Sequence, residues 1–253
     1  KWRDYSKLKL KKGDYFGNLV ASAHFEFERE AAKVGKPVDK SEWGMTPPTV
    51  NAYYNPLNNE MAFPAGILQP PFFSKDFPTA MNFGGIGMVM GHELTHGFDD
   101  EGSQYDAQGN LKNWWEPAVN ERFKEKTSCV ADQYSRYEAL PGLKLNGQLT
   151  LGENIADLGG VKLAYAALRA TRRDPAAAVP AGGYSEEQQF FLAMGQGWCA
   201  KTRPELERLL VQTNPHSPPR FRVQGALANL PEFAAAFACG APADEKEKAC
   251  VVW

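Results

Sequence analysis

The stretch HELTH, from His92 to His96, constrains the fold of this 253-residue chain more than any other feature. Residues four apart on an α-helix lie one above the other, so His92 and His96 present two imidazoles on one face, spaced for a single metal ion. Glu93 is turned by about 100° around the helix axis. Its carboxylate is therefore expected beside the ion, where it accepts a proton from metal-bound water. The spacing predicts a helix that carries a hydrolytic metal site.

The helix around this motif is expected over about Gly85–Phe98. An apolar stripe is expected to hold it against the core and leave the histidines facing a cleft. The stripe consists of Ile86, Met90, Leu94 and Gly97. The alternative is that the two histidines only form hydrogen bonds within the protein. The chain has four histidines, and composition alone gives this spacing on the order of 1% of the time.

A catalytic zinc has three protein ligands and an open position for water, so a third ligand is required. The segment LGENIADLGG offers Glu153 at the start of a predicted helix and Asp157 one turn later on the same side. Thr150 to Glu153 also fits a capping box, and Asp157 equally suits a surface charge. Other acidic residues lie nearer to the histidines in the chain, so the residues alone leave the third ligand open: Asp99, Asp100 and Glu101.

Composition indicates a soluble globular protein, with 43% hydrophobic and 23% charged residues, and one catalytic domain is expected over residues 1–253. A net charge of -2 argues against nucleic acid as a partner. The one dense basic run, KLKLKKGD, is expected to be a solvated loop. No apolar run reaches the ~18 to 20 residues of a membrane helix, and no secretory signal is visible. Because the chain starts without Met, we expect a mature product or a piece of a longer protein.

The four cysteines show no C-x-x-C spacing of a zinc or redox site. They are Cys129, Cys199, Cys239 and Cys250. An even number at long separations fits disulfides in an oxidising compartment and favours an exported protein. Four buried thiols in a cytosolic enzyme are the alternative, and three pairings are open.

Hydrophobic periodicity predicts a mainly helical α+β fold with a small sheet. A hairpin is expected from strands at Thr49–Tyr54 and Glu60–Pro64, joined by the turn NPLNN. DPAAAVPAGG, Asp174–Gly183, is expected to be a flexible connection. Further helices are expected over Asp14–Val34, Glu116–Tyr137, Glu153–Ala170, Ser185–Lys201 and Arg203–Val211. The first carries an apolar stripe of Phe16, Leu19, Val20, Ala23, Phe27 and Ala31, and its His24 is interpreted as a structural or surface histidine.

Four motifs in order, NAYYNP, HELTH, ENIADLGG and the C-terminal C-x-V-W, closely resemble the neprilysin family of zinc metallopeptidases. The similarity runs from about Trp43 to the last residue. It implies a thermolysin-like zincin fold with one Zn²⁺ per chain. By resemblance Glu93 is the general base, and Asp157 and Asp99 hydrogen-bond the ligand histidines. The implied zinc ligands are His92, His96 and Glu153.

The resemblance also implies a set of substrate contacts. Asn51 and Ala52 match an edge strand that binds the substrate backbone. His216 matches the histidine that stabilises the oxyanion, and Arg222 the arginine that holds substrate carbonyl or carboxylate groups. A pocket for a large hydrophobic residue just after the scissile bond is implied at Ile67, Phe72, Met88, Val89 and Trp198. Gly197 departs from the pattern, since the best-known member has a branched residue there, which leaves the pocket width open.

Family members are usually about 650 residues or longer and have an N-terminal helical lobe that restricts substrates to short peptides. This lobe is expected to be absent or to be a separate chain. The resemblance pairs Cys129 with Cys250 and leaves Cys199 and Cys239 without their upstream partners.

The functional hypothesis is therefore a zinc-dependent endopeptidase that cleaves short peptides on the amino side of large hydrophobic residues, outside the cytoplasm. That location covers secreted, periplasmic and ectodomain forms. A catalytically silent, zinc-stabilised binding module is the second hypothesis. A cytosolic binding protein with reduced thiols and no metal is the third.

Overall fold

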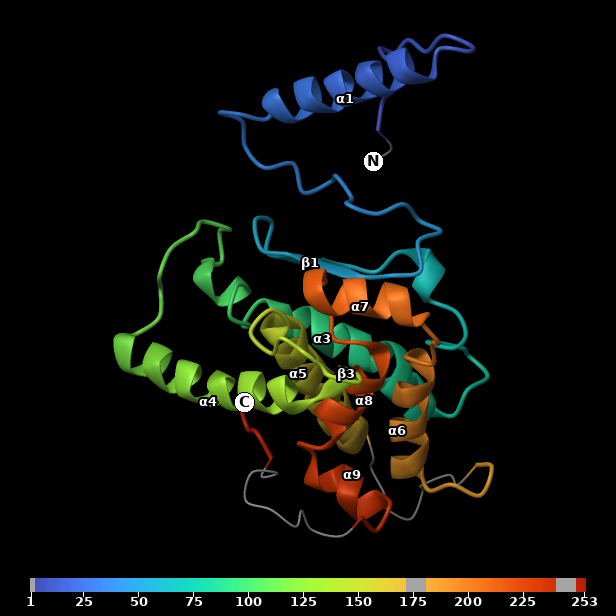
Figure 1. Cartoon of the computed structure of the whole chain (residues 1–253), viewed down its shortest axis with the longest axis vertical. Helices are drawn as coiled ribbons and strands as arrows, with labels where there is room; N and C mark the ends of the chain where they lie inside the picture. Colours follow the sequence, from blue (N-terminus) through green and yellow to red (C-terminus); the bar gives the residue numbers. More distant parts are fainter. Residues whose placement is uncertain (1–2, 172–180, 240–248) are drawn as a thin grey trace. The chain divides into compact units, whose positions relative to one another are not determined.

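The computed structural model describes residues 3–171, 181–239 and 249–253 (Figure 1), and the chain divides into two compact units, Lys1–Thr46 and Pro47–Trp253. The expectation of one catalytic domain over residues 1–253 stays a prediction. The expected flexible connection lies outside the described residues except for its last three positions.

The first unit contains helix α1, Tyr15–Ala31, within the predicted range. The helix begins where the Asp14 side chain accepts a hydrogen bond from the Gly17 N–H at 2.9 Å, which satisfies one of the free donors at the N-terminus. The preceding basic run is exposed and irregular, as expected. His24 is exposed and lies 3.7 Å from Glu28, so it is a surface histidine.

The predicted apolar stripe of α1 is found on the helix, but it is not covered within this unit. No residue of α1 is buried, and Phe16 and Phe27 are 76% and 71% exposed. Contacts that hold the unit include ion pairs at the end of the helix, where Arg29 contacts Glu26 at 2.9 Å and Glu42 at 3.0 Å, and the Tyr5–Phe25 ring pair at 5.6 Å.

The second unit is mainly helical, with two small antiparallel sheets. The predicted hairpin forms from β1 (Tyr53–Asn55) and β2 (Glu60–Ala62), which pair with Tyr54 opposite Met61. The other strands, β3 and β4, span Glu138–Leu140 and Leu143–Lys144. The helices are α2 (Thr79–Asn82), α3 (Met88–His96), α4 (Pro117–Arg136), α5 (Leu151–Thr171), α6 (Glu186–Gly197), α7 (Pro204–Thr213), α8 (Pro219–Leu227) and α9 (Pro231–Ala236). A π-helical turn at Phe83–Gly87 leads into α3, and short 3₁₀ turns lie at Ala65–Ile67 and Gly102–Gln104.

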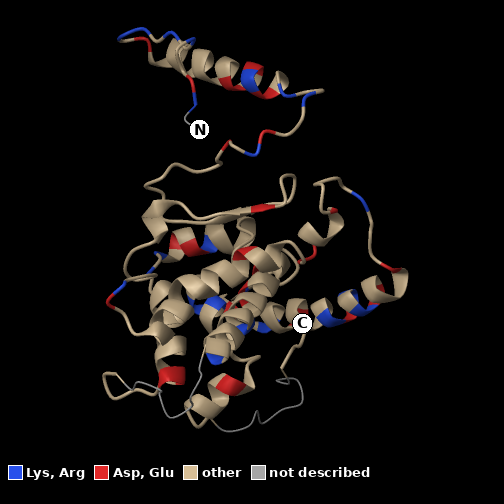
Figure 2. Cartoon of the chain, turned by 180° about the vertical axis from the view of Figure 1, so that it is seen from behind, with Lys and Arg blue, Asp and Glu red and all other residues tan. Residues whose placement is uncertain are grey.

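The main core surrounds α5, which buries one face of apolar side chains almost completely. Ile155, Val161 and Leu168 are each 0% exposed. They pack with buried residues of α4, α6 and α8 in one hydrophobic cluster, including Val130 and Phe190. The opposite surface of α4 carries interspersed acidic and basic side chains (Figure 2), which is typical of a solvated helix face.

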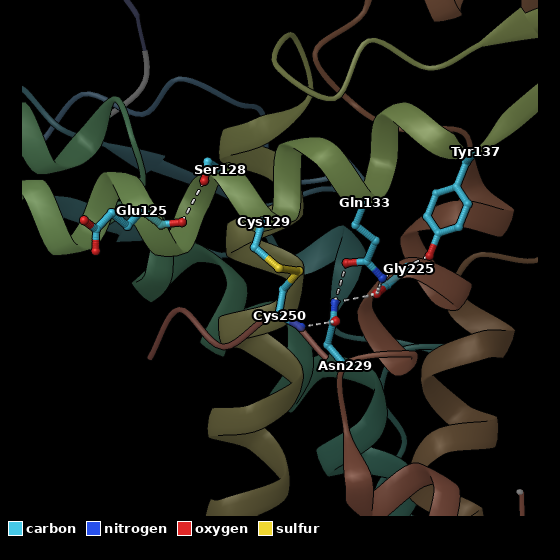
Figure 3. Close-up of a disulfide and its surroundings, with 8 residues drawn as sticks. All are labelled: Glu125, Ser128, Cys129, Gln133, Tyr137, Gly225, Asn229 and Cys250. Carbon is cyan, nitrogen blue, oxygen red and sulfur yellow. Dashed lines mark hydrogen bonds between the residues drawn. A yellow bond between two sulfur atoms is a disulfide. The ribbon is translucent and has the colours of Figure 1, made fainter. Parts of the chain in front are cut away.

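A disulfide between Cys129 and Cys250 attaches the C-terminal segment to α4, which confirms the pairing implied by the resemblance. Figure 3 shows the polar contacts beside it: the Cys250 N–H donates to Asn229 Oδ1 at 2.7 Å, and Asn229 Nδ2 donates to Gln133 Oε1 at 2.8 Å. Cys199 is an exposed free thiol, and so is Cys239. The C-terminal segment is therefore fixed both covalently and by buried hydrogen bonds.

Helices α3 and α5 cross in backbone contact at the centre of the unit (Figure 1). A Cβ atom at Gly91 would lie 2.7 Å from the Gly160 carbonyl oxygen, and a Cβ at Gly160 would lie 2.7 Å from the His92 nitrogen. Only glycine permits this approach. The crossing brings the HELTH helix against the helix that carries Glu153.

The predicted apolar stripe on α3 is confirmed at Ile86, which is 7% exposed, and wrong at Met90 and Leu94, which are 47% and 45% exposed. The buried side of the helix contains Met88 together with His92, Glu93 and Thr95. The contact between Gly91 and Gly160 holds this side of α3 against α5.

Candidate metal centre

His92, His96 and Glu153 come together from α3 and α5, and one ligand atom from each lies within 4.8 Å of the others. The two Nε2 atoms are 3.0 Å apart, and they lie 3.4 Å and 3.6 Å from the Glu153 carboxylate oxygens. Ligands of a tetrahedral Zn²⁺ with bonds of ~2.0 to 2.2 Å are separated by about 3.3 Å. The donor set and its spacing therefore fit a zinc ion.

Each histidine has a carboxylate at its other ring nitrogen. His96 Nδ1 forms a 2.7 Å hydrogen bond with Asp99 Oδ2, which assigns the proton to Nδ1 and leaves the Nε2 lone pair for a metal. His92 Nδ1 lies 2.9 Å from Asp157 Oδ1, an ion-pair separation without the angle of a hydrogen bond. The structure thus places Asp99 in a hydrogen bond with His96 and Asp157 beside His92 without one, and their role as partners of ligand histidines stays a prediction.

The buried charges around His92 favour its positive form when no metal is bound. Burial lowers the pKa of His92, but Asp157 and Glu153 outweigh burial and raise the pKa to about 9. Burial also raises the pKa of Asp157, yet the Arg222 guanidinium and His92 hold it well below its usual range. The site is therefore arranged to compensate a cation.

Glu153 directs its carboxylate into the site and not toward its own helix end. Besides the two histidines, it lies 3.2 Å from His216 Nε2 and 3.2 Å from Arg222 Nη2. Burial raises the pKa of Glu153, but His92 and Arg222 lower it to about 2. The capping-box interpretation is wrong, since the Thr150 hydroxyl donates to the Asn146 carbonyl instead.

Glu93, which follows the first histidine, is 5% exposed on the buried side of α3. Burial raises the pKa of its carboxyl group, and the nearby charges of His92 and His96 oppose that shift. A carboxylate held in this way is a stronger proton acceptor than one in water.

His216 is held by its own loop. Asn214 Oδ1 accepts hydrogen bonds from both the His216 N–H and the ring Nδ1, each at 2.8 Å. Because a backbone N–H is always a donor, the shared atom is the amide oxygen, and Nδ1 carries the proton. Nε2 faces Glu153, and burial lowers the pKa of the imidazole. Sequence reasoning missed Asn214, although Asn two residues before a histidine is a common loop-forming pattern.

Arg222 on α8 is 5% exposed and contacts Asp157 with two atoms, Nε and Nη2, each at 2.7 Å. Its guanidinium carbon lies 3.9 Å from the centre of the Trp198 ring, within cation–π range. Trp198 was expected to line a substrate pocket, and the structure also places it against this arginine.

The expected substrate-contact residues are distributed over several parts of the fold. Asn51 and Ala52 directly precede β1, which in the described residues pairs only with β2. Ile67, Phe72 and Val89 belong to a second, smaller apolar cluster, whereas Met88 is in the main core. A Cβ at Gly197 would lie 3.1 Å from the Phe72 ring, so this ring occupies the space of a larger residue there.

An HExxH helix crossing a glutamate-bearing helix in a mainly helical fold defines the zincin type of metallopeptidase site. Comparisons with known proteins agree. The sequence model of peptidase family M13 matches residues 51–250, and the chain belongs to this family. The endothelin-converting enzyme homolog of Locusta migratoria is 46% identical over 255 residues, 99% of this chain and 35% of that protein. Human endothelin-converting enzyme 1 is 47% identical over 243 residues, 94% of this chain and 31% of that protein.

Solved structures show the same relationship. The crystal structure of Mycobacterium tuberculosis zinc metalloprotease ZMP1 with an inhibitor has a TM-score of 0.92 and 41% identity, covering 100% of this chain and 40% of that chain. The crystal structure of PepO from Lactobacillus rhamnosis has a TM-score of 0.81 and 33% identity, and the match covers 98% of this chain and 38% of that chain. The chain thus spans about a third of its curated relatives. No helix among the described residues is long and apolar enough to span a membrane.

Proposed function

We propose that this chain carries the catalytic centre of a zinc-dependent endopeptidase. The observation that carries the proposal is the convergence of His92, His96 and Glu153 within 4.8 Å, with Glu93 buried on the same helix. When bound, a zinc ion would polarise the scissile carbonyl and lower the pKa of a water to roughly 7. Membership of a zinc peptidase family supports this assignment.

In this mechanism the residues of the chain position the reactants and move protons. Glu93 accepts a proton from the attacking water and later delivers it to the leaving amine. His216 donates Nε2–H to the oxygen on which negative charge develops only when its imidazole is protonated, a form that its lowered pKa restricts to lower pH. Arg222 contacts both Asp157 and Glu153 and favours their ionised forms. Asp99 and Asp157 orient the two ligand histidines.

The substrate part of the proposal is a short peptide cleaved before a large hydrophobic residue. The apolar cluster with Ile67, Phe72 and Val89 supports it, and so does the position of Asn51 and Ala52 directly before strand β1. Names of the relatives, which include endothelin-converting enzymes, agree with peptide substrates. The N-terminal lobe, attached or separate, would complete the enzyme. The Cys129–Cys250 disulfide supports an extracytoplasmic location.

The test is Glu93→Gln in the full-length protein that carries this chain. The variant keeps the volume and removes the proton acceptor, so zinc content should be unchanged and turnover of a fluorogenic peptide should fall by about 10²-fold or more. Glu101→Gln, a matched change at the next glutamate along the chain, should keep parental turnover. Full activity of Glu93→Gln would reject the assignment of the base. Zinc binding without any chelator-sensitive cleavage by the parent would favour the silent binding module instead.

A further inference from the structure

The loop that carries His216 is attached to α5 by a buried hydrogen bond between two neutral side chains. Ser217 follows His216 in the chain, and Asn154 follows Glu153. Ser217 Oγ donates to Asn154 Oδ1 at 2.8 Å, and the two residues are 2% and 1% exposed. The bond therefore joins the immediate neighbours of two residues of the candidate site, 63 positions apart in the chain.

The acceptor in this bond is held in one orientation. Asn154 Nδ2 donates to Thr150 Oγ1 at 2.9 Å, and the Thr150 hydroxyl donates to the Asn146 carbonyl at 3.2 Å. Because the amide nitrogen is engaged with Thr150, the amide oxygen is the atom that faces Ser217. The start of α5 thus presents a fixed acceptor beside Glu153.

The donor side is also rigid. Asn214 fixes the His216 ring relative to its own loop through two hydrogen bonds, and the loop contains Pro215 and Pro218, which restrict its backbone. The ring and the loop therefore move together. Their attachment to α5 through Ser217 sets where His216 Nε2 lies, which is 3.2 Å from Glu153 Oε1.

We propose that Ser217 and Asn154 are positioning residues that hold His216 at the place where it meets the developing oxyanion. This inference rests on the proposed peptidase function. Displacing a catalytic group by about 1 Å can lower a rate by ~10²-fold, so a loop attachment of this kind acts mainly on turnover. Neither residue contacts substrate or metal; both act through His216.

The test is Ser217→Ala in the full-length protein, combined with His216→Ala in a double-mutant cycle. Ser217→Ala should lower kcat by about 10- to 100-fold, with KM within about twofold and zinc content unchanged. In the His216→Ala background, Ser217→Ala should change kcat by less than about twofold, because the group that it positions is missing. Losses that add in the double variant would overturn the proposal, as would a kcat for Ser217→Ala close to that of the parent.

Ser135→Ala is the matched control, since the Ser135 hydroxyl likewise forms hydrogen bonds, donating to the Ala131 carbonyl and accepting from the Gly147 N–H, but lies on α4. Its kcat should equal that of the parent. If Ser217→Ala does not fold, Ser217→Cys keeps the volume and replaces the hydroxyl by a weak donor, and the same non-additivity should be seen.

A second measurement does not depend on turnover. With Co²⁺ bound in place of zinc, the paramagnetic shift of the His216 ring protons reports their distance from the ion. Ser217→Ala should reduce this shift, and Ser135→Ala should not. An unchanged shift in Ser217→Ala would contradict the proposal even if the peptidase assignment itself had failed the Glu93→Gln test.

Discussion

Replacing Gly160 by alanine tests whether backbone contact between α3 and α5 builds the metal centre. A Cβ at this position would lie 2.7 Å from the His92 nitrogen, 2.8 Å from the Met88 oxygen and 2.9 Å from the His92 Cα. Ordinary contact begins at 3.4 Å. The difference, 3.4 minus 2.7, requires the two helices to separate by up to about 0.7 Å locally. All the obstructing atoms are backbone, so no side chain can rotate away.

The expected loss of stability follows from two opposing contributions, and the expected loss of zinc affinity follows from how little zinc–ligand distances can vary. Overpacking costs about 1 to 3 kcal/mol, partly offset by up to ~1 kcal/mol from the better helix propensity of alanine. A shift of ~0.7 Å exceeds the ~0.2 Å tolerance of zinc–ligand distances. The loss of zinc affinity should therefore exceed the loss of stability. It should reach about 10- to 100-fold, which is comparable to removing a residue that hydrogen-bonds a zinc-ligating histidine.

The assay is zinc competition against a chelating dye, with thermal unfolding of the metal-free protein measured in parallel. Gly195→Ala on α6 is the control, because a Cβ there would meet only a Val223 methyl group at 3.9 Å, an ordinary contact. It should keep the zinc affinity and be as stable as the parent or slightly more stable. A Gly160→Ala protein with parental zinc affinity would refute the argument that the glycine contact positions the ligands.

Two further substitutions test the charges around the site. Arg222→Lys removes the two-atom contact to Asp157 and should destabilise the protein by about 3 kcal/mol in denaturant titrations, because a buried carboxylate is left poorly compensated; a change below ~1 kcal/mol would contradict this. Burial and Asp99 raise the pKa of Asp100 from 3.8 to about 6, so its ionisation opposes folding increasingly as pH rises from 3.8 to 6. Asp100→Asn should thus stabilise the protein by about 1 to 2 kcal/mol at pH 7.5, discounted for partial exposure, and by almost nothing at pH 3.5. Equal stabilisation at both pH values would refute it.

Local patterns in the sequence were sufficient to predict most helices of the second unit. The predicted range Glu116–Tyr137 contains α4, and the range Gly85–Phe98 contains α3 together with most of the π-helical turn before it. These segments have strong periodicity and clear ends. Helices α2, α8 and α9 were not predicted, because α2 and α9 have only four and six residues and the apolar residues of α8 show almost no helical periodicity.

Hydrophobic periodicity could not predict which distant segments of the chain come into contact. The HELTH spacing placed two imidazoles on one face, but the residues alone left the third ligand open until the family resemblance pointed to Glu153. Nothing in the local sequence connects Ser217 with Asn154, since their hydrogen bond depends on how α5 and the loop before α8 pack. The prediction that Met90 and Leu94 on α3 are buried was wrong for a related reason. The glycines at the crossing with α5 form the close contact there, and a pattern of apolar residues does not reveal a contact between glycines.

The charges of the site explain why a divalent ion, and not a monovalent one, suits this cluster. Asp99, Asp157 and Glu153 contact the two histidines, and one guanidinium, Arg222, contacts Asp157 and Glu153, within a largely buried region. These three carboxylates and one guanidinium leave two negative charges before Glu93 is counted, and at least two positive charges are needed because buried charge is costly unless it is compensated. Zn²⁺ with two neutral imidazoles supplies them. When no Zn²⁺ is bound, the raised pKa of His92 means that its imidazole carries a proton, and this proton supplies part of the positive charge. Metal binding and protonation of this histidine therefore compete for one electrostatic role.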